Sequence, residues 1–599
     1  GHDGDDAGGG VDLARAPDRT AGPHRHRIRR GIRHLHGLGG LDGADPRPHH
    51  RPGLGAGGRH PGAADPHQLG LRPVLRRPSA AVAGPPQAVG GGAGPCRLRR
   101  GPGGGPPRQG RGGLVAVRRG DDPREPLKRE FRAAWLPTIF RSEYAGLARQ
   151  EARQLLTRRI ELLRQTGCNV LIFQVRAEGD AWYPSELEPW SRYLTGRQGE
   201  APEPSWDPLG FVINECHSRG IEVHAWMNPY RGAANADQPL DAKHPARRHP
   251  ELFIRYGKQL VMDPGNPQSV RYITSVVRDL VKRYDVDAIH YDDYFYPYPK
   301  DGEQFNDDAS FRRFGMAVGF HPEEKAQWRR SNVDRLISET RSVILDTKPW
   351  VRFGVSPFGI YRNASSDSKG SKTSGLQNYD DLYADVLRWK DKGWVDYIIP
   401  QIYWNIGHPA ADYWELVSWW GKQLQRSSTQ LYIGQHTQRT MDSGQLEAKL
   451  TQSRHFAQGN AWWLAENILR NYRGLGDSLL KTYQRYPALL PEYRGVFGRT
   501  KAPRSISKIM EDYNEDGHML LWVDHRDDDD PEQAYYYAVY RFAEGERMDH
   551  SNPRHLVSVS TKPYYILPLA RPGKKYTYLV TAINRFWQES KPAKITIRY

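Results

Sequence analysis

From residue 129 onward, short runs of β-branched and aromatic residues alternate with longer segments whose apolar positions repeat at helical spacing. Short apolar runs bounded by glycine, proline and polar residues are typical of buried strands. The pattern predicts eight strands, at 131–139, 169–175, 221–227, 286–291, 351–356, 396–402, 430–435 and 460–464.

Helical spacing fills the segments between these strands. Leu156, Ile160 and Leu163 lie on one face of the first predicted helix. Asp207 before Pro208 is typical of an N-cap followed by a first-turn proline. The predicted helices lie near 147–166, 207–219, 267–284, 323–347, 380–392, 411–425, 443–457 and 476–486.

This alternation over residues 129–490 predicts an α/β fold, a (β/α)8 TIM barrel with insertions. A doubly wound open sheet is the alternative, but it usually has fewer strands and a phosphate-binding loop, which we do not find. In a barrel, the chemistry lies at the C-terminal ends of the strands. Those positions are therefore where we look for functional residues.

The end of the chain has a different pattern. Residues 491–502 predict a linker, and residues 503–599 lose the helical spacing. Short alternating runs separated by turn residues predict a small all-β sandwich there. Trp522 and the run at 576–584 resemble a fibronectin type III module, which implies a spacing or attachment role. The acidic run at 527–530 predicts a solvated loop rather than a calcium site.

The first 125 residues differ in composition from the rest of the chain. The first aromatic residue is Phe131, and half of the 60 glycines lie before residue 121. Such a segment buries too little apolar area to fold, so we predict disorder. Arg, Gly, Pro, Ala and His without aromatic residues are also typical of GC-rich DNA translated in a wrong frame. Our hypothesis is that this segment is a frameshift artefact; a basic tail that binds anionic polymers is the alternative.

Composition excludes several classes of protein. No apolar run is long enough to span a bilayer, so we expect no transmembrane segment. Three cysteines are too few for a disulfide scaffold, and we find no motif with metal-ligand spacing. The net charge is +17, but most of it lies in residues 1–128, so we expect no nucleic-acid partner. The string GLGAGG at 53–58 matches a dinucleotide-binding fingerprint, but no predicted strand precedes it and no predicted helix follows it. We therefore expect no cofactor.

The predicted strand ends carry the side chains that glycosidic cleavage uses: two carboxyl groups, with aromatic and hydrogen-bonding groups for the sugar. Asp292 and Asp293 follow the fourth strand, and Asp180 follows the second. We predict Asp293 as one catalytic carboxylate, with Asp292 and Asp180 next. The predicted substrate-binding residues are Arg176, Glu178, Tyr183, His224, Trp226, Asn228, Tyr230, Arg231, His290, Tyr294, Tyr296, Arg362, Gln401, Tyr403 and Trp404.

Several long strings of residues 129–490 resemble the family-10-like glycosyl hydrolases. They include EFRAAW at 130–135, HAWMNPYR at 224–231, VDAIHYDDYFYPYP at 286–299 and KPWVRFGVSPFGIYRN at 348–363. The resemblance places the family's DDY motif on Asp292, Asp293 and Tyr294, and its second-strand motif on Arg176 and Asp180.

The resemblance implies a barrel that acts on glycans. Members include bacterial envelope proteins, often lipoproteins, and one branch cleaves peptidoglycan glycan strands without stem peptides. Because muramic acid carries a lactyl carboxylate, Arg176, Arg231 and Arg362 are the expected anion-binding residues. We therefore expect a polysaccharide partner and a location in the cell envelope, although we recognise no signal peptide at the start of the sequence.

Two questions stay open in the sequence. A non-catalytic glycan-binding protein is the alternative, because we find no clear second carboxylate after the fifth, sixth or seventh strand. Retaining and inverting mechanisms differ in the separation of the two carboxyl groups, about 5 Å against about 6.5–9.5 Å, which a sequence does not give.

Overall fold

The computed structural model describes residues 122–523 and 526–599. The prediction of disorder for residues 1–125, and with it the frameshift hypothesis, falls almost entirely outside these ranges. Within them, no helix is long and apolar enough to cross a membrane.

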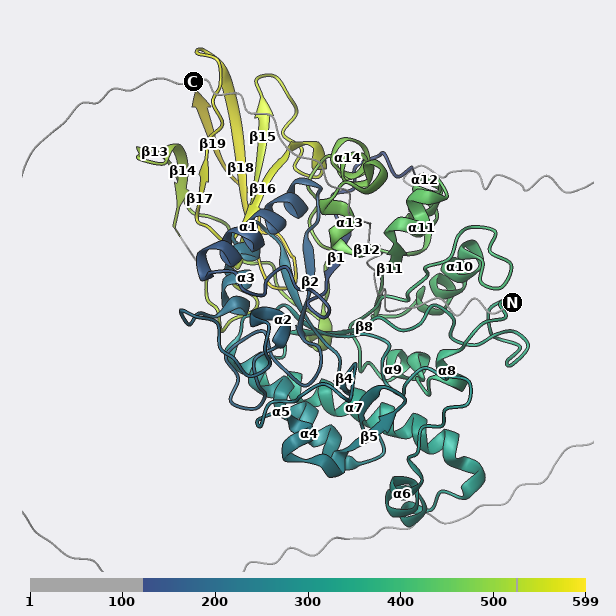
Figure 1. Ribbon diagram of the computed structural model, residues 1–599. Helices are drawn as coiled ribbons and strands as arrows, with labels where there is room; N and C mark the ends of the chain where they lie inside the picture. Colours follow the sequence, from purple (N-terminus) through teal and green to yellow (C-terminus); the bar gives the residue numbers. More distant parts are fainter. Residues whose placement is uncertain (1–121, 524–525) are drawn as a thin grey trace, which may run out of the picture. The chain divides into compact units, whose positions relative to one another are not determined.

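A parallel β-barrel is the main element of the described chain (Figure 1), with hydrogen-bonded strand order β10-β9-β8-β7-β3-β2-β1-β12-β11. Only Tyr432 separates β10 from β11, and its N–H donates to Ile398 O at 3.0 Å, so the two form one barrel position. A bridge between Gln401 and Gly434 joins the two ends of the sheet. The predicted (β/α)8 class is therefore confirmed. The strands are β1 (Phe131–Leu136), β2 (Val170–Arg176), β3 (Glu222–Met227), β7 (Ala288–Tyr291), β8 (Arg352–Val355), β9 (Tyr397–Ile398), β10 (Gln430–Leu431), β11 (Ile433–His436) and β12 (Gly459–Trp463).

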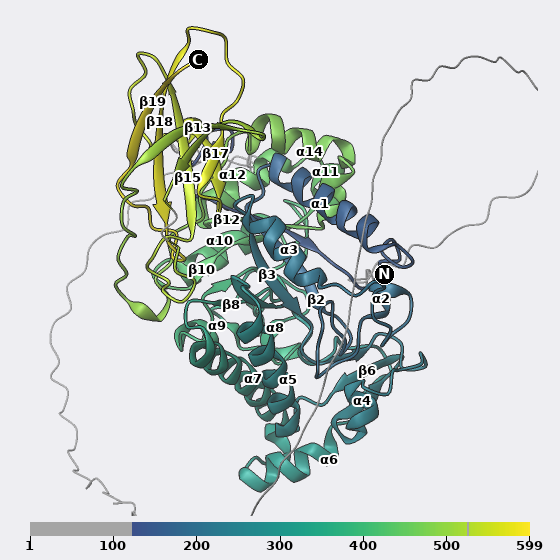
Figure 2. The ribbon, with the colours of Figure 1, turned by 90° about the vertical axis from the view of Figure 1, so that its left-hand side faces the viewer.

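Helices surround the barrel strands (Figure 2). The predicted cap of α3 is present, since the Asp207 side chain accepts a hydrogen bond from Gly210 N at 3.0 Å. The larger helices are α1 (Arg149–Gln165), α3 (Pro208–His217), α5 (Pro267–Arg283), α7 (Lys325–Thr347), α10 (Tyr413–Leu424) and α12 (Leu446–Phe456). The shorter ones are α2 (Arg192–Thr195), α4 (Pro245–Arg248), α6 (Asp308–Ser310), α8 (Asn378–Asp381), α9 (Val386–Asp391), α11 (Thr437–Asp442), α13 (Ala465–Leu469) and α14 (Leu475–Ser478).

Two predicted helices are not continuous. The segment predicted as one helix at 380–392 is divided between α8 and α9, with Tyr383 at a φ of 56° between them. A positive φ interrupts the helical backbone even where the apolar spacing continues. The segment predicted at 476–486 begins as α14 and ends in the π-helical stretch Leu479–Tyr483.

A small antiparallel sheet lies between β3 and α5, with strand order β4-β6-β5. Its strands are β4 (Arg231–Ala233), β5 (Phe253–Tyr256) and β6 (Gln259–Met262). The sequence prediction missed it because these strands are three or four residues long and are only partly buried. The sheet sets Arg231 at the first position of β4, four residues after β3 ends.

The described C-terminal segment forms two antiparallel sheets, as predicted for an all-β sandwich. One has the order β13-β14-β17 and the other β16-β15-β18-β19. Trp522 is buried between them against Tyr537, with ring centroids 5.3 Å apart. The strands are β13 (Ile509–Asn514), β14 (Gly517–Trp522), β15 (Tyr536–Ala543), β16 (Leu556–Ser560), β17 (Tyr564–Ile566), β18 (Lys575–Ile583) and β19 (Ala593–Arg598).

The segment after β18 contacts the N-terminal end of the barrel. The Trp587 indole is buried and donates to Glu222 Oε1 at 2.5 Å, at the first residue of β3. Glu222 also binds His224 and Arg352 inside the barrel. Trp587 thus joins a buried ionic cluster at the end of the barrel opposite the strand ends where function is expected.

Candidate active site

Asp292 and Asp293 directly follow β7, which lies between β3 and β8 in the barrel. Both residues are only 4% exposed. Their burial follows from the local sequence, because the apolar strand Ala288–Tyr291 leads straight into the pair without an intervening turn residue. The structure thus places both predicted carboxylates at the C-terminal mouth of the barrel.

Donors from β3 and its following turn hold the Asp292 carboxylate. The indole Nε1 of Trp226 donates to Asp292 Oδ2 at 3.1 Å, and the Asn228 side-chain amide donates to the same oxygen. Asp292 Oδ1 accepts from the backbone N–H of Tyr294 at 3.3 Å. Both Trp226 and Asn228 were predicted as substrate-binding residues, and here they orient a carboxylate.

A different set of donors holds the Asp293 carboxylate. Gln401 Nε2 donates to Asp293 Oδ1 at 3.0 Å and to Ser356 O at 2.8 Å. The hydroxyl of Tyr298 donates to Asp293 Oδ2. The two adjacent aspartates are therefore held by opposite neighbours, Asp292 by the β3 side and Asp293 by the β9 side.

The pair is poised to hold a proton near neutral pH. Burial, and next the charge of Asp293, raise the pKa of Asp292 to about 7. Burial also raises the pKa of Asp293, against the hydrogen bonds from Tyr298 and Gln401, which lower it. Since like charges this close resist joint ionisation, the pair titrates as one unit. It can therefore supply both a proton donor and a proton acceptor.

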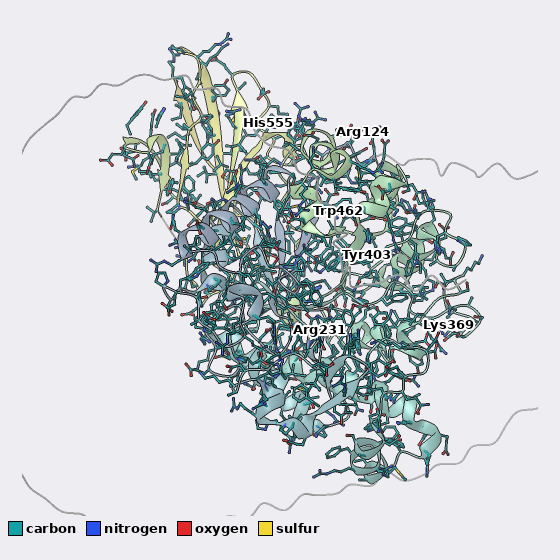
Figure 3. All side chains as sticks on the ribbon, in the orientation of Figure 1. Arg124, Arg231, Lys369, Tyr403, Trp462 and His555 are labelled. Carbon is teal, nitrogen blue, oxygen red and sulfur yellow. The ribbon has the colours of Figure 1, made fainter. Side chains whose placement is uncertain are left out.

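Arg231 is the cationic group beside the pair, and its charge lowers the pKa of both carboxyls. Its guanidinium stacks over the ring of Tyr294 at 4.6 Å from the centroid. Within the described ranges, no carboxylate lies within ion-pair distance of Arg231, which is partly exposed. Arg231 therefore keeps donors for a ligand. Figure 3 labels Arg231 and, from the turn after β9, Tyr403.

The other two predicted anion-binding arginines are satisfied within the protein. Arg176 is 1% exposed, makes a bidentate ion pair with Glu188 and donates to the carbonyl of Asn228 at 2.6 Å. Arg362 pairs with Asp380 and Asp367 at 2.8 and 2.9 Å. Sequence alone does not distinguish these arginines from Arg231, because their partners, 5 to 18 residues further along the chain, are brought beside them only by the folded turns.

The two carboxylates that follow β2, Glu178 and Asp180, accept hydrogen bonds within the protein. Asp180 accepts from the backbone N–H of Glu178 at 3.1 Å and from Gln198 Nε2 at 3.3 Å. Glu178 accepts from Ala234 N at 2.5 Å, and burial raises its pKa. Tyr183 packs edge-on against Tyr284, with centroids 5.4 Å apart. Asp180 is thus held within this turn and, in the described chain, shares no hydrogen-bond donor with Asp292 or Asp293.

Four further predicted residues are buried beneath or beside the mouth. His224 and His290 both contact the hydroxyl of Tyr397 inside the barrel, at 2.9 and 3.1 Å. Tyr296 accepts a hydrogen bond from Asn332, and the hydroxyl of Tyr230 has no hydrogen-bond partner in the described chain. Burial lowers the pKa of both histidines, so at neutral pH they are uncharged core groups.

Partly exposed aromatic rings surround the carboxylates. Tyr403 meets His436 with centroids 5.5 Å apart, and Trp404 meets Phe358 at 5.4 Å. The sequence prediction missed Tyr298, which binds Asp293. Its position just after β7 was an available signal. Such rings provide apolar faces for sugars.

The parallel barrel has the features of a glycoside hydrolase-type barrel at its C-terminal mouth: a buried carboxyl pair, aromatic rings and an arginine without an ion-pair partner among the described residues. The chain belongs to the glycosyl hydrolase-like 10 family, whose model matches residues 130–451. Glycosyl hydrolase YngK of Bacillus subtilis (strain 168) is 37% identical over 490 residues, covering 78% of this chain and 94% of that protein.

Two further proteins are similar. Glycosyl hydrolase DigH of Escherichia coli (strain K12) is 38% identical over 324 residues, covering 51% of this chain and 72% of that protein. The solved glycoside hydrolase domain of PgaB from Bordetella bronchiseptica is 13% identical with a TM-score of 0.39, covering 59% of this chain and 98% of that domain.

Proposed function

We propose that this protein hydrolyses glycosidic bonds in the glycan strands of bacterial peptidoglycan that lack stem peptides, and that it acts in the cell envelope. The observation that carries the proposal is the buried Asp292–Asp293 pair next to an arginine without an ion-pair partner in the described chain. The pair supplies acid–base chemistry, and burial keeps one proton on it near neutral pH.

Arg231 supports an anionic substrate over a neutral one. An unpaired guanidinium at a partly exposed site binds a carboxylate by charge-assisted hydrogen bonds. Each muramic acid of a glycan strand without stem peptides carries such a carboxylate on its lactyl group. Stem peptides occupy this carboxylate in intact peptidoglycan, so their removal exposes the group that Arg231 would bind.

The test is mass spectrometry of amidase-treated peptidoglycan incubated with the full chain, with Asp293→Asn and with Asp334→Asn. Asp334 is a matched control, because burial also raises its pKa, to about 6, and it lies on α7, bound to Trp389. New reducing ends from the parent and Asp334→Asn, but not from Asp293→Asn, are expected. Sedimentation with the glycan but no new ends from any protein would instead indicate a non-catalytic glycan-binding protein.

A further inference from the structure

The two carboxylates of the mouth lie on one strand end, which differs from the usual glycosidase arrangement. Retaining and inverting enzymes normally place two carboxyl groups on opposite sides of the sugar, so that one protonates the leaving oxygen while the other acts across the ring. Asp292 and Asp293 are consecutive, and each is fixed by its own donors. Neither is free to swing to the far wall.

Among the described residues, the strand ends of the far wall carry no carboxylate that is free to act as the second group. In the described chain, the side chains at the ends of β8, β9, β11 and β12 are Ser356, Gln401, His436 and Trp463. Asp442, whose charge acts on His436, is paired with Arg473. Glu466, which follows β12, is paired with Arg159 and Arg470. These strand ends therefore provide no nucleophile facing Asp292 and Asp293, and Glu178 after β2 is held by the backbone N–H of Ala234.

On the basis of the proposed function, we infer that the nucleophile is the 2-acetamido group of the substrate. The Asp292–Asp293 pair then supplies the acid and the base that this reaction needs. A sugar with this group can displace its own leaving group, because its acetamide carbonyl oxygen can form a bond to C1 of the same sugar residue. The protein then needs one acid for the leaving oxygen and, next to it, one carboxylate for the amide N–H. Two consecutive carboxylates meet this requirement, whereas carboxylates on opposite walls do not.

The reaction balances with water as the only added reactant. One aspartate gives its proton to the glycosidic oxygen as the C1–O bond breaks and its electron pair leaves with the departing sugar. The acetamide oxygen bonds to C1, and the other aspartate accepts the amide proton, which leaves a neutral oxazoline. Water then attacks C1 and passes its proton to the first aspartate. The C1–O bond of the oxazoline breaks, and the second aspartate returns the proton to the amide nitrogen.

The contacts of the pair fit this division. Asp292 is fixed by Trp226 and Asn228 on one side, and Asp293 by Gln401 and Tyr298 on the other, so the two carboxyls present oxygens in different directions. Partly exposed aromatic rings around the mouth provide apolar surface for the methyl group of an acetamide. The inference therefore restricts the substrate to 2-acetamido sugars at the cleaved residue.

The test uses the full chain and glycan strands that have been chemically N-deacetylated and then re-acylated. Re-acetylated strands, the control, are expected to be cleaved like native strands. Trifluoroacetylated strands should show kcat reduced by more than about tenfold, because fluorine withdraws electron density from the carbonyl oxygen, and strands with free amines should resist cleavage. The first product should also retain the anomeric configuration, seen by NMR.

Three results would overturn the inference. Equal kcat values for acetylated and trifluoroacetylated strands, or a glycosyl adduct on a carboxylate in the mass spectrum of the quenched protein, would leave the hydrolase function standing and reject the mechanism. Failure to cleave even native and re-acetylated strands would reject the proposed function together with the inference.

In a supporting measurement, Asp292→Asn and Asp293→Asn are compared on an aryl 2-acetamido-2-deoxy-β-glucoside. One variant should recover activity there, because an aryl leaving group needs no acid.

Discussion

Gln401 donates a hydrogen bond to Asp293 across the width of one intervening strand, at 3.0 Å from Nε2 to Oδ1. Asp293 follows β7 and Gln401 follows β9, with β8 between them in the sheet. The same amide also binds the carbonyl of Ser356 after β8. One side chain thus fixes the carboxylate relative to three strand ends, so the geometry of the site depends on the closure of the barrel.

Replacing Gln401 with leucine should reduce kcat and move the alkaline limb of the pH profile upward. The lost donor normally lowers the pKa of Asp293, so without it the pair keeps its proton to higher pH. A fall in kcat of about 10- to 100-fold is expected, since general acid–base catalysis contributes on that order or more. The measurement is kcat from pH 5 to 9. A lower kcat with an unshifted profile would contradict the electrostatic role of Gln401.

The activity of the parent protein should decline as the pH rises through about 7. This is the pKa of Asp292, raised by burial and by the charge of Asp293, and the reaction requires one proton on the pair. Above that pH, kcat is expected to fall about tenfold per pH unit. Initial rates of reducing-end release in buffers of constant ionic strength would show it. A rate that keeps rising to pH 9 would exclude this pair as the proton donor.

Asp292→Asn should stabilise the fold in alkaline but not in acidic solution. The Asp292 carboxyl has a pKa of about 7 in the folded protein and about 3.9 in the unfolded chain. Its contribution to folding stability is therefore fully present below about pH 4 and is lost as the pH rises to 7. The amide does not ionise, so the variant should gain up to about 4 kcal/mol relative to the parent between pH 4 and pH 8. Urea unfolding at both pH values measures it. Asp334→Asn, at a pKa raised to about 6, should show the same sign with a smaller change.

Arg231→Gln should raise KM for glycan strands with free lactyl carboxylates by about 10- to 100-fold, the range for a lost charge-assisted contact. Arg362→Gln should have the smaller effect, because Asp380 and Asp367 already occupy its guanidinium. Chitin oligosaccharides lack the carboxylate, so KM for them should change little in either variant. Equal effects of the two substitutions on the anionic strands would argue against Arg231 as their binding residue.

Trp587→Ala should destabilise the protein by about 3–5 kcal/mol, the usual range for deleting a buried tryptophan side chain. The indole is 1% exposed and donates to Glu222, which would lose a partner inside a buried ionic cluster. Trp587→Phe keeps most of the packing and should cost less. Guanidinium unfolding of each variant gives the values. Parent-like stability of the alanine variant would mean that this contact with the barrel contributes nothing.

The amino-acid pattern by itself determined the order of elements. Eight apolar runs separated by helical segments predicted every barrel position, because a parallel strand covered on both faces must be apolar along its length. The strand-end rule then located Asp292 and Asp293. The same reasoning missed β4, β5 and β6, whose few, half-buried residues carry no clear period.

Only the tertiary structure decided what each polar residue does. Arg176 and Arg231 look alike in sequence, but Glu188 neutralises the first, whereas no described carboxylate pairs with the second. Asp180 and Asp293 both follow barrel strands. Asp180 accepts a hydrogen bond within its own turn, whereas Asp293 lies at the mouth and is bound by Gln401. The reason is physical: periodicity reports burial along one element, whereas charge, pKa and availability depend on partners that folding brings beside each residue, either from a nearby turn or from another strand end.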